Sequence, residues 1–365
     1  MPCLKIGIIG VGNISKTYID HLGKLDTVKV VACADINEAR AHSVAKENSI
    51  QKSGSVKELL EDSEIDLILN LTAPKAHFEV AFAALNHGKH VYNEKPLSVE
   101  RAEGEKLVNL AESNSLMLGC APDTFLGSGL QTCRYLIDEG LIGYPIGFNA
   151  FMLSAGPESW HPAPEFFYKR GGGPLFDMGP YYLTAIVSLL GPISKVSAFA
   201  RASYPVRSIK QGDLAGTEIN VETPTHHVAA LELKSGVLGQ LQTSFDVHAS
   251  NIPCIEIYGS EGTLSVPDPN TFDGPVSVRT REGSGWEDRA LTYHPVINGR
   301  GLGIYDLANA LEFGFGPRAS GKLALHVLDA MHSILESAES GRALDLRLQV
   351  DQPSPMGKDP VKAPI

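Results

Sequence analysis

The sequence lacks long apolar runs and has few cysteines. No stretch of its 365 residues is long and apolar enough to cross a bilayer, so we expect no membrane span. The five cysteines are odd in number, widely spaced and without a CxxC pair, and no HExxH motif occurs. These absences argue against a disulfide framework and against a bound metal. The first residues enter a strand pattern without a charged and then apolar leader, so we expect a cytoplasmic protein.

Long runs of one charge are also missing. The formal net charge is -11, and the charged residues are spread along the chain. Phosphates would be repelled by such a surface, which argues against a nucleic-acid partner. Hydrophobic residues make up 43% of the chain, and a length of 365 residues favours two domains, each with its own core.

The most informative segment that is present is a glycine-rich turn. An apolar strand at Ile6–Ile9 leads into Gly10-Val11-Gly12, and a helix is expected over Asn13–Leu22. Gly10 permits the tight turn, and Gly12 lets the backbone approach a pyrophosphate. The first helical amides, at Asn13 and Ile14, would point at the phosphates. The segment therefore predicts a dinucleotide site.

Two further residues refine this site. Ser15 occupies the third position of the fingerprint, where Gly or Ala is usual, but it is small enough for the helix to pack on the strand. A second strand, Val28–Ala34, ends on Asp35, at the distance where a carboxylate accepts hydrogen bonds from the ribose diol. A carboxylate repels a 2'-phosphate, and Arg40 is the only nearby cation. NAD is therefore favoured over NADP as the cofactor.

The organisation of the chain changes near residue 122. Up to there, buried strands alternate with helices, which predicts an N-terminal Rossmann domain (1–122) with a doubly wound parallel sheet. Strand signals then dominate and predict an α+β domain (123–348) on a large, mostly antiparallel open sheet. Residues 349–365 lack periodicity and are expected to form an extended tail. We expect helices near Gly179–Leu190 and Ser320–Ser340 to cover one sheet face, and the other face to form a homodimer or homotetramer.

Two strings follow strands of the first domain, where ligands gather in doubly wound sheets. In Thr72-Ala73-Pro74-Lys75-Ala76-His77, Thr72 and Pro74 would wall the cofactor, while His77 has either a cofactor role or a local packing role. Glu94-Lys95-Pro96 follows the strand His90–Tyr92. A surface ion pair is the ordinary reading of Glu94 and Lys95, but their place at a strand end favours function.

A third string lies in the second domain. Gly171-Gly172-Gly173-Pro174-Leu175-Phe176-Asp177 leads into a helix that contains Tyr181. Asp177 is either the N-cap of that helix or a functional carboxylate. If Asp177 and Tyr181 both have helical geometry, their spacing places them on one face, as a pair that can handle a proton.

With these strings, the chain resembles the glucose-fructose oxidoreductase, inositol dehydrogenase and rhizopine catabolism family (Gfo/Idh/MocA) to about residue 345. The resemblance implies NAD(P)-dependent oxidation or reduction of sugars, cyclitols and related polyols. It implies that Lys95 touches the nicotinamide ribose and the substrate, and that Asp177 orients the reacting hydroxyl. The residue four positions later is commonly His; some members carry Tyr, as this chain does at Tyr181. Either Tyr181 or Lys95 then handles the proton.

Two more segments are candidates for the substrate pocket. Asp123 and Thr124 stand where many relatives carry an Arg-Phe type sequence, and they could line the pocket where the domains meet. In Glu158-Ser159-Trp160-His161-Pro162, Trp160 could stack on a sugar ring and His161 could bind hydroxyls; a Trp buried in the core is the alternative.

Three functions remain open from the sequence. The first is net hydride transfer between NAD and a secondary hydroxyl or ketone of a sugar, glycoside or cyclitol. The second is a glycoside-cleaving enzyme that retains its NAD, in which transient oxidation permits elimination. The third is a sugar- or NAD-sensing protein without turnover, although Lys95, Asp177 and Tyr181 together favour catalysis.

Overall fold

The computed structural model describes residues 3–357 and divides the chain into two compact units, each described here by itself. The first unit consists of residues 3–128, 293–328 and 353–357, and the second of Gly129–Thr292 and Asp329–Gln352. This division differs from the predicted one, because residues 293–328 return to the first unit. The predicted tail is described as far as Gly357, without helix or strand; its remainder lies outside the described residues.

The first unit contains a six-stranded parallel sheet in the order β3-β2-β1-β4-β5-β6. This order, which reverses between β1 and β4, confirms the predicted Rossmann fold. The short strand β3 was not expected, since it has no apolar run. The strands are β1 (Leu4–Ile9), β2 (Val28–Ala34), β3 (Lys52–Gly54), β4 (Leu67–Asn70), β5 (His90–Asn93) and β6 (Leu118–Cys120).

The helices of this unit alternate with its strands, as expected. Helix α5 begins at Arg101, and its N-cap is Glu100, which forms a capping box with Glu103. The Ser98 hydroxyl, two residues before this N-cap, donates to the Glu100 carbonyl oxygen at 2.9 Å. The helices are α1 (Asn13–Leu22), α2 (Glu38–Glu47), α3 (Val56–Glu61), α4 (His77–Asn86), α5 (Arg101–Ser113) and α8 (Leu302–Phe313), with the short 3-10 helices η1 (Pro74–Ala76) and η2 (Thr124–Leu126).

The second unit is built on a nine-stranded sheet in the order β16-β15-β14-β13-β7-β12-β11-β8-β17. All neighbours are antiparallel except β7 and β12, which confirms the mostly antiparallel prediction. The strands are β7 (Pro145–Leu153), β8 (Ile193–Arg201), β11 (His226–Leu233), β12 (Leu238–Ser244), β13 (Ile255–Gly259), β14 (Gly262–Val266), β15 (Val276–Thr280), β16 (Glu287–Arg289) and β17 (Leu344–Asp345); β9 (Val206–Ser208) and β10 (Glu218–Asn220) form a separate pair.

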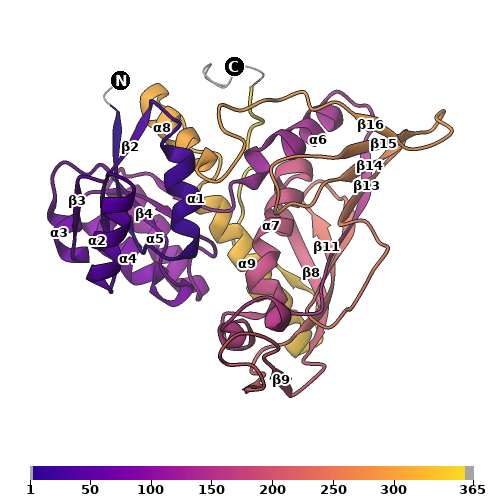
Figure 1. Ribbon diagram of the computed structural model, residues 1–365. Helices are drawn as coiled ribbons and strands as arrows, with labels where there is room; N and C mark the ends of the chain where they lie inside the picture. Colours follow the sequence, from indigo (N-terminus) through magenta and orange to yellow (C-terminus); the bar gives the residue numbers. More distant parts are fainter. Residues whose placement is uncertain (1–2, 358–365) are drawn as a thin grey trace. The chain divides into compact units, whose positions relative to one another are not determined.

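Helix α7 (Gly173–Leu190) covers one face of this sheet and packs against β7, β11 and β12 (Figure 1). Alternate residues of β8 and β11 are buried beneath the helices, in the period of two that a half-covered sheet requires. The intervening residues face the other way, and Phe199 is 78% exposed there. The unit also contains α6 (Ser128–Asp138), η3 (Pro157–Ser159), η4 (Pro164–Tyr168) and the C-terminal part of α9 (Gly321–Ser340).

No helix within residues 3–357 combines the length and the apolarity that a membrane crossing needs.

Candidate active site

The glycine turn between β1 and α1 has the shape that a pyrophosphate requires. Gly10 has φ +93°, and a Cβ there would lie 2.8 Å from the carbonyl carbon of Leu71, so only glycine fits. A Cβ on Gly12 would meet no atom within 4 Å. Helix α1 also has no side-chain cap, which leaves its first amides available to an anion. Asn13 and the half-buried Ile14 begin that helix, as predicted.

Ser15 stabilises this turn as well as fitting beneath it. The residue is 3% exposed, and its hydroxyl donates to the Gly12 carbonyl oxygen at 2.7 Å. The departure from Gly or Ala at the third fingerprint position therefore adds a bond that holds the turn in place, and small size is only part of its role.

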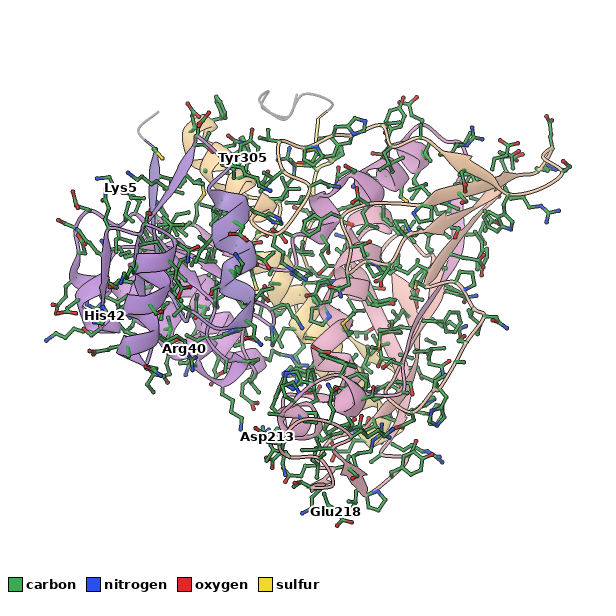
Figure 2. The ribbon with its side chains drawn as sticks, in the orientation of Figure 1. Lys5, Arg40, His42, Asp213, Glu218 and Tyr305 are labelled. Atoms are coloured by element: carbon green, nitrogen blue, oxygen red, sulfur yellow. The ribbon has the colours of Figure 1, made fainter. Side chains whose placement is uncertain are left out.

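Asp35 lies at the end of β2, beside the same turn. Its carboxylate accepts hydrogen bonds from the backbone amides of Val11 and Asn37, both at 2.9 Å. The guanidinium of Arg40 on α2, labelled in Figure 2, lies 3.9 Å from the carboxylate. A carboxylate has about four lone-pair sites, so it keeps sites for a ribose diol. The residues of this unit fit NAD, and the Asp35 carboxylate would disfavour the extra phosphate of NADP.

The next strand end, after β4, holds Thr72, Pro74 and His77. Thr72 donates from its hydroxyl to Asn70 at 2.7 Å, and Pro74 opens the 3-10 helix η1. His77 is 1% exposed, and its ring nitrogens lie 2.6 Å from the Pro96 carbonyl oxygen and 2.9 Å from that of Thr72. Burial lowers the pKa of His77, and these two contacts oppose that shift. His77 therefore joins two strand-end loops, and any effect on a cofactor would pass through them.

The Glu94-Lys95-Pro96 turn follows β5 and is held on both sides of Lys95. The Lys95 amide donates to the Glu94 carboxylate at 2.8 Å, and His77 contacts Pro96. Asn93 donates from its side chain to the Leu97 carbonyl oxygen at 3.1 Å. The backbone around Lys95 is thus fixed by hydrogen bonds within the first unit.

Three residues that support this turn were missed by the sequence reasoning. Tyr18 on α1 donates its hydroxyl to Glu94 at 2.9 Å, and Asn70 donates to the side chain of Asn93 at 3.0 Å. A signal existed for Tyr18, because it lies on the buried face of an amphipathic helix, and a buried phenol needs a polar partner. The two asparagines end neighbouring parallel strands, which is the corresponding signal for them.

Asp123 and Thr124, predicted to line the pocket, are buried in the first unit. Asp123 is fully buried, and its carboxylate accepts hydrogen bonds from the amides of Gly301 and Gly303 at 2.8 and 3.1 Å. It therefore satisfies orphan amides at the start of α8. Thr124 is 1% exposed at the start of η2. The local sequence did not predict that both residues are buried at the start of η2.

Helix α7 carries Asp177 and Tyr181 in the second unit. The helix begins at Gly173, six residues before the predicted start, and its N-cap is Gly172. The N-cap interpretation of Asp177 is therefore wrong, because the residue lies inside the helix. Both side chains have helical geometry, so their four-residue spacing places them on the same face. Tyr182, the next residue, is 3% exposed, as expected for a core position.

Trp160 and His161 lie on a loop of the same unit, between η3 and η4. Trp160 is 61% exposed, so the alternative of a tryptophan buried in the core is wrong. Its ring meets those of His161 and Phe167 edge to face, at centroid distances of 5.5 and 6.0 Å. A large exposed aromatic surface beside a histidine remains suited to a sugar ring.

The predicted site residues fall into two groups. Those expected to bind the cofactor lie together in the first unit with Lys95, while Trp160, His161, Asp177 and Tyr181 lie in the second. Within residues 3–357, no group of three or more His, Cys, Asp or Glu side chains is arranged to hold a metal ion.

Comparisons with known proteins give the following matches. Residues 4–121 match the Gfo/Idh/MocA oxidoreductase family with an NAD-binding Rossmann fold, and residues 130–265 match the Gfo/Idh/MocA C-terminal domain. A 1,5-anhydro-D-fructose reductase from Ensifer adhaerens is 25% identical over 93% of this chain and 98% of its own length. A myo-inositol 2-dehydrogenase from Thermotoga maritima is 24% identical over 72% of this chain and 74% of its own.

Solved structures repeat the match in three dimensions. A levoglucosan dehydrogenase in complex with NADH and L-sorbose superimposes with a TM-score of 0.83 at 21% identity, over 96% of this chain and all of that one. At this identity the likeness establishes the fold, and the Rossmann domain followed by the open-sheet domain is common to both.

Proposed function

The chain belongs to the Gfo/Idh/MocA family of NAD-binding oxidoreductases, and from this premise we propose that it transfers hydride between NAD and a secondary hydroxyl or ketone of a sugar, glycoside or cyclitol. Gly10, Gly12, Asn13, Ile14 and Asp35 would hold the pyrophosphate and the adenosine ribose. Thr72, Pro74, Glu94 and Lys95 would line the nicotinamide side. The bound cofactor supplies the hydride acceptor or donor at its nicotinamide ring.

The residues of this chain then have to manage one proton. A secondary hydroxyl loses its proton as its carbon loses hydride, so a base must face that oxygen. An unperturbed tyrosine has a pKa of about 10, and a nearby ammonium favours its phenolate. In this proposal Asp177 orients the hydroxyl, Lys95 stabilises the developing alkoxide, and Tyr181 or Lys95 accepts the proton. Trp160 and His161 would bind the sugar ring.

The observation that supports this proposal most strongly is the Asp177–Tyr181 pair on α7. A carboxylate and a phenol one helical turn apart are a poor choice for a purely structural helix face, because Tyr181 is buried, Asp177 is partly buried, and polar groups lose hydration there. They suit the two tasks of orienting a hydroxyl and handling its proton.

We expect Lys95→Ala and Tyr181→Phe to lower turnover by about 10²- to 10⁴-fold, the usual contribution of a general acid or base. NAD binding should survive in both, because neither side chain contacts the pyrophosphate in this assignment. The measurement is NADH absorbance with a panel of sugars and cyclitols, beside NAD titration. Tyr182→Phe is the matched control and should keep its rate. A Tyr181→Phe enzyme with nearly full rate would show that Tyr181 is not the base.

The same assay separates the two other functions. Net dehydrogenation accumulates NADH, whereas a glycoside-cleaving cycle returns its hydride and releases the aglycone without net NADH. A sensor would bind members of the panel, and neither absorbance nor product would change.

We propose further that two copies of this chain associate through the uncovered face of the nine-stranded sheet, as a homodimer or as part of a homotetramer. Phe199 and Val228 are direct cross-strand partners on that face, 78% and 38% exposed, and Leu238 on β12 is 61% exposed on the same face. Exposed apolar residues grouped on one sheet face are typical of an interface.

A further inference from the structure

Glu94 uses both of its carboxylate oxygens inside the first unit. One oxygen accepts the backbone amide of Lys95 at 2.8 Å, and the other accepts the hydroxyl of Tyr18 at 2.9 Å. The residue is only 9% exposed. A buried carboxylate needs such donors, and bonds to a charged acceptor are stronger than neutral ones. The carboxylate therefore connects the phenol of one helix to the peptide of Lys95.

Tyr18 lies within a helix that is itself positioned by the dinucleotide turn. It is fully buried on α1, on the same face as Ser15, and Ser15 is bonded to Gly12. Burial, and then the neighbouring Glu94, raise the pKa of Tyr18 well above its usual value. The phenol therefore stays protonated and acts as a hydrogen-bond donor across the working pH range.

The other side of the turn is held independently. His77 contacts the Pro96 carbonyl oxygen at 2.6 Å, and Asn93 bonds to the Leu97 carbonyl oxygen at 3.1 Å. These two bonds hold the chain on the C-terminal side of Lys95, whereas the Glu94 bonds hold its N-terminal side. Loss of the Tyr18 bond should therefore rotate the Lys95 peptide without unfolding the loop.

We propose that Tyr18 is a positioning residue that fixes the orientation of Lys95 through Glu94, and so links the dinucleotide-binding helix to the reacting end of the site. The inference rests on the proposed function, in which Lys95 touches the substrate. The phenol itself touches no reacting atom. Its effect is on where Lys95 points, and a misplacement of about 1 Å at a reacting group costs about 100-fold in rate.

The first test compares Tyr18→Phe with Tyr92→Phe. Tyr92 is a buried tyrosine two residues before Glu94, and its hydroxyl has no hydrogen-bond partner among the described residues, so its loss removes no bond. We expect Tyr18→Phe to lower kcat by about 10- to 100-fold while KM and NAD affinity stay within about twofold. Tyr92→Phe should retain the wild-type kcat. Equal kcat values in the two variants would overturn the proposal.

A double-mutant cycle tests the route through Glu94. Glu94→Gln keeps one acceptor oxygen and removes the charge, so this single substitution should lower kcat. Adding Tyr18→Phe to it should lower kcat little further. A purely structural effect of Tyr18 would instead leave kcat unchanged in Tyr18→Phe and would appear only as a lower unfolding midpoint, which would add to any loss of stability in Glu94→Gln.

A readout without turnover separates this inference from the proposed function. The rate at which an amine-specific reagent labels Lys95 is measured by peptide mass spectrometry, with the exposed Lys75 as internal reference. The inference is supported if Lys95 is labelled faster in Tyr18→Phe and at the wild-type rate in Tyr92→Phe, even if no polyol is turned over. Absence of polyol turnover would count against the proposed function alone. Unchanged labelling in Tyr18→Phe refutes the inference. If Tyr18→Phe does not fold, Glu94→Gln gives the same two readings.

Discussion

At the scale of single residues, we propose that Asp35 determines which dinucleotide binds. Its carboxylate is fixed by the amides of Val11 and Asn37, so it cannot turn away from an incoming phosphate. Like charges brought together at a binding site cost several kcal/mol, and about 1.4 kcal/mol corresponds to a factor of ten in affinity.

We therefore expect Asp35→Ser to increase the affinity for NADP relative to NAD by about tenfold or more. Arg40, whose guanidinium now lies 3.9 Å from Asp35, would become free to pair with the 2'-phosphate. Dissociation constants for both cofactors, measured by fluorescence, give the ratio without any need for a substrate. Glu38→Ser, which removes the same charge from the exposed start of α2, should leave that ratio unchanged. An unaltered ratio in Asp35→Ser would mean that another residue excludes NADP.

Residue-scale prediction from the sequence works best where the backbone geometry is local. The positive φ of Gly10 and the open space at Gly12 agree with the tight turn that the sequence pattern predicts. Asp123 shows the opposite case, because its partners Gly301 and Gly303 lie 178 and 180 residues away. No local pattern encodes such a bond, so the sequence did not predict that Asp123 caps the start of α8.

At the scale of elements, the turn between β1 and α1 permits a matched pair of substitutions. Gly10 has a positive φ and no room for a Cβ, whereas Gly12 has φ -77° and open space in front of it. We therefore propose that the two glycines serve different needs: the fold requires Gly10, and cofactor binding requires Gly12.

We expect Gly12→Ala to fold with a nearly unchanged unfolding free energy and to bind NAD about tenfold or more weakly, because the added methyl group occupies the pyrophosphate space. Gly10→Ala should lose about 2 kcal/mol or more of stability, since strain and a backbone clash combine. Urea unfolding and NAD titration measure both quantities. Equal losses of stability in the two variants would contradict this division of roles.

The elements themselves were predictable to different degrees. Strands with continuous apolar runs, such as β2, lie where the pattern placed them, because burial on both faces requires those residues. Helix α7 begins six residues before its predicted start, because glycine and proline at its first turn are not typical of a helix. The late predicted start placed Asp177 just before the helix, and this left the N-cap interpretation of Asp177 open.

At the scale of the whole molecule, each of the two units is built from segments that are not contiguous in the sequence. Helix α8 and the first part of α9 belong to the first unit, although more than 160 residues of the second unit separate them from its earlier part. The bond from the Cys120 amide to the Ala319 carbonyl oxygen, at 2.9 Å, is one of the contacts that return this segment. Amphipathic periodicity shows that a helix will be buried, but it does not show against which sheet, and so the return was not predicted.

The uncovered face of the nine-stranded sheet supplies the last prediction. Phe199 stands opposite Val228 on the neighbouring strand, and a phenylalanine that is 78% exposed gains hydrophobic free energy when a second copy covers it. We expect Phe199→Asp to shift the protein toward monomer, because the interface would then bury an unpaired carboxylate. Sedimentation velocity over a range of concentrations measures this shift. Phe313→Asp, at the end of α8, is the control and should leave the assembly intact, since that 46% exposed ring lies outside the sheet. A wild-type protein that stays monomeric at every concentration would remove the sheet face as an interface between copies.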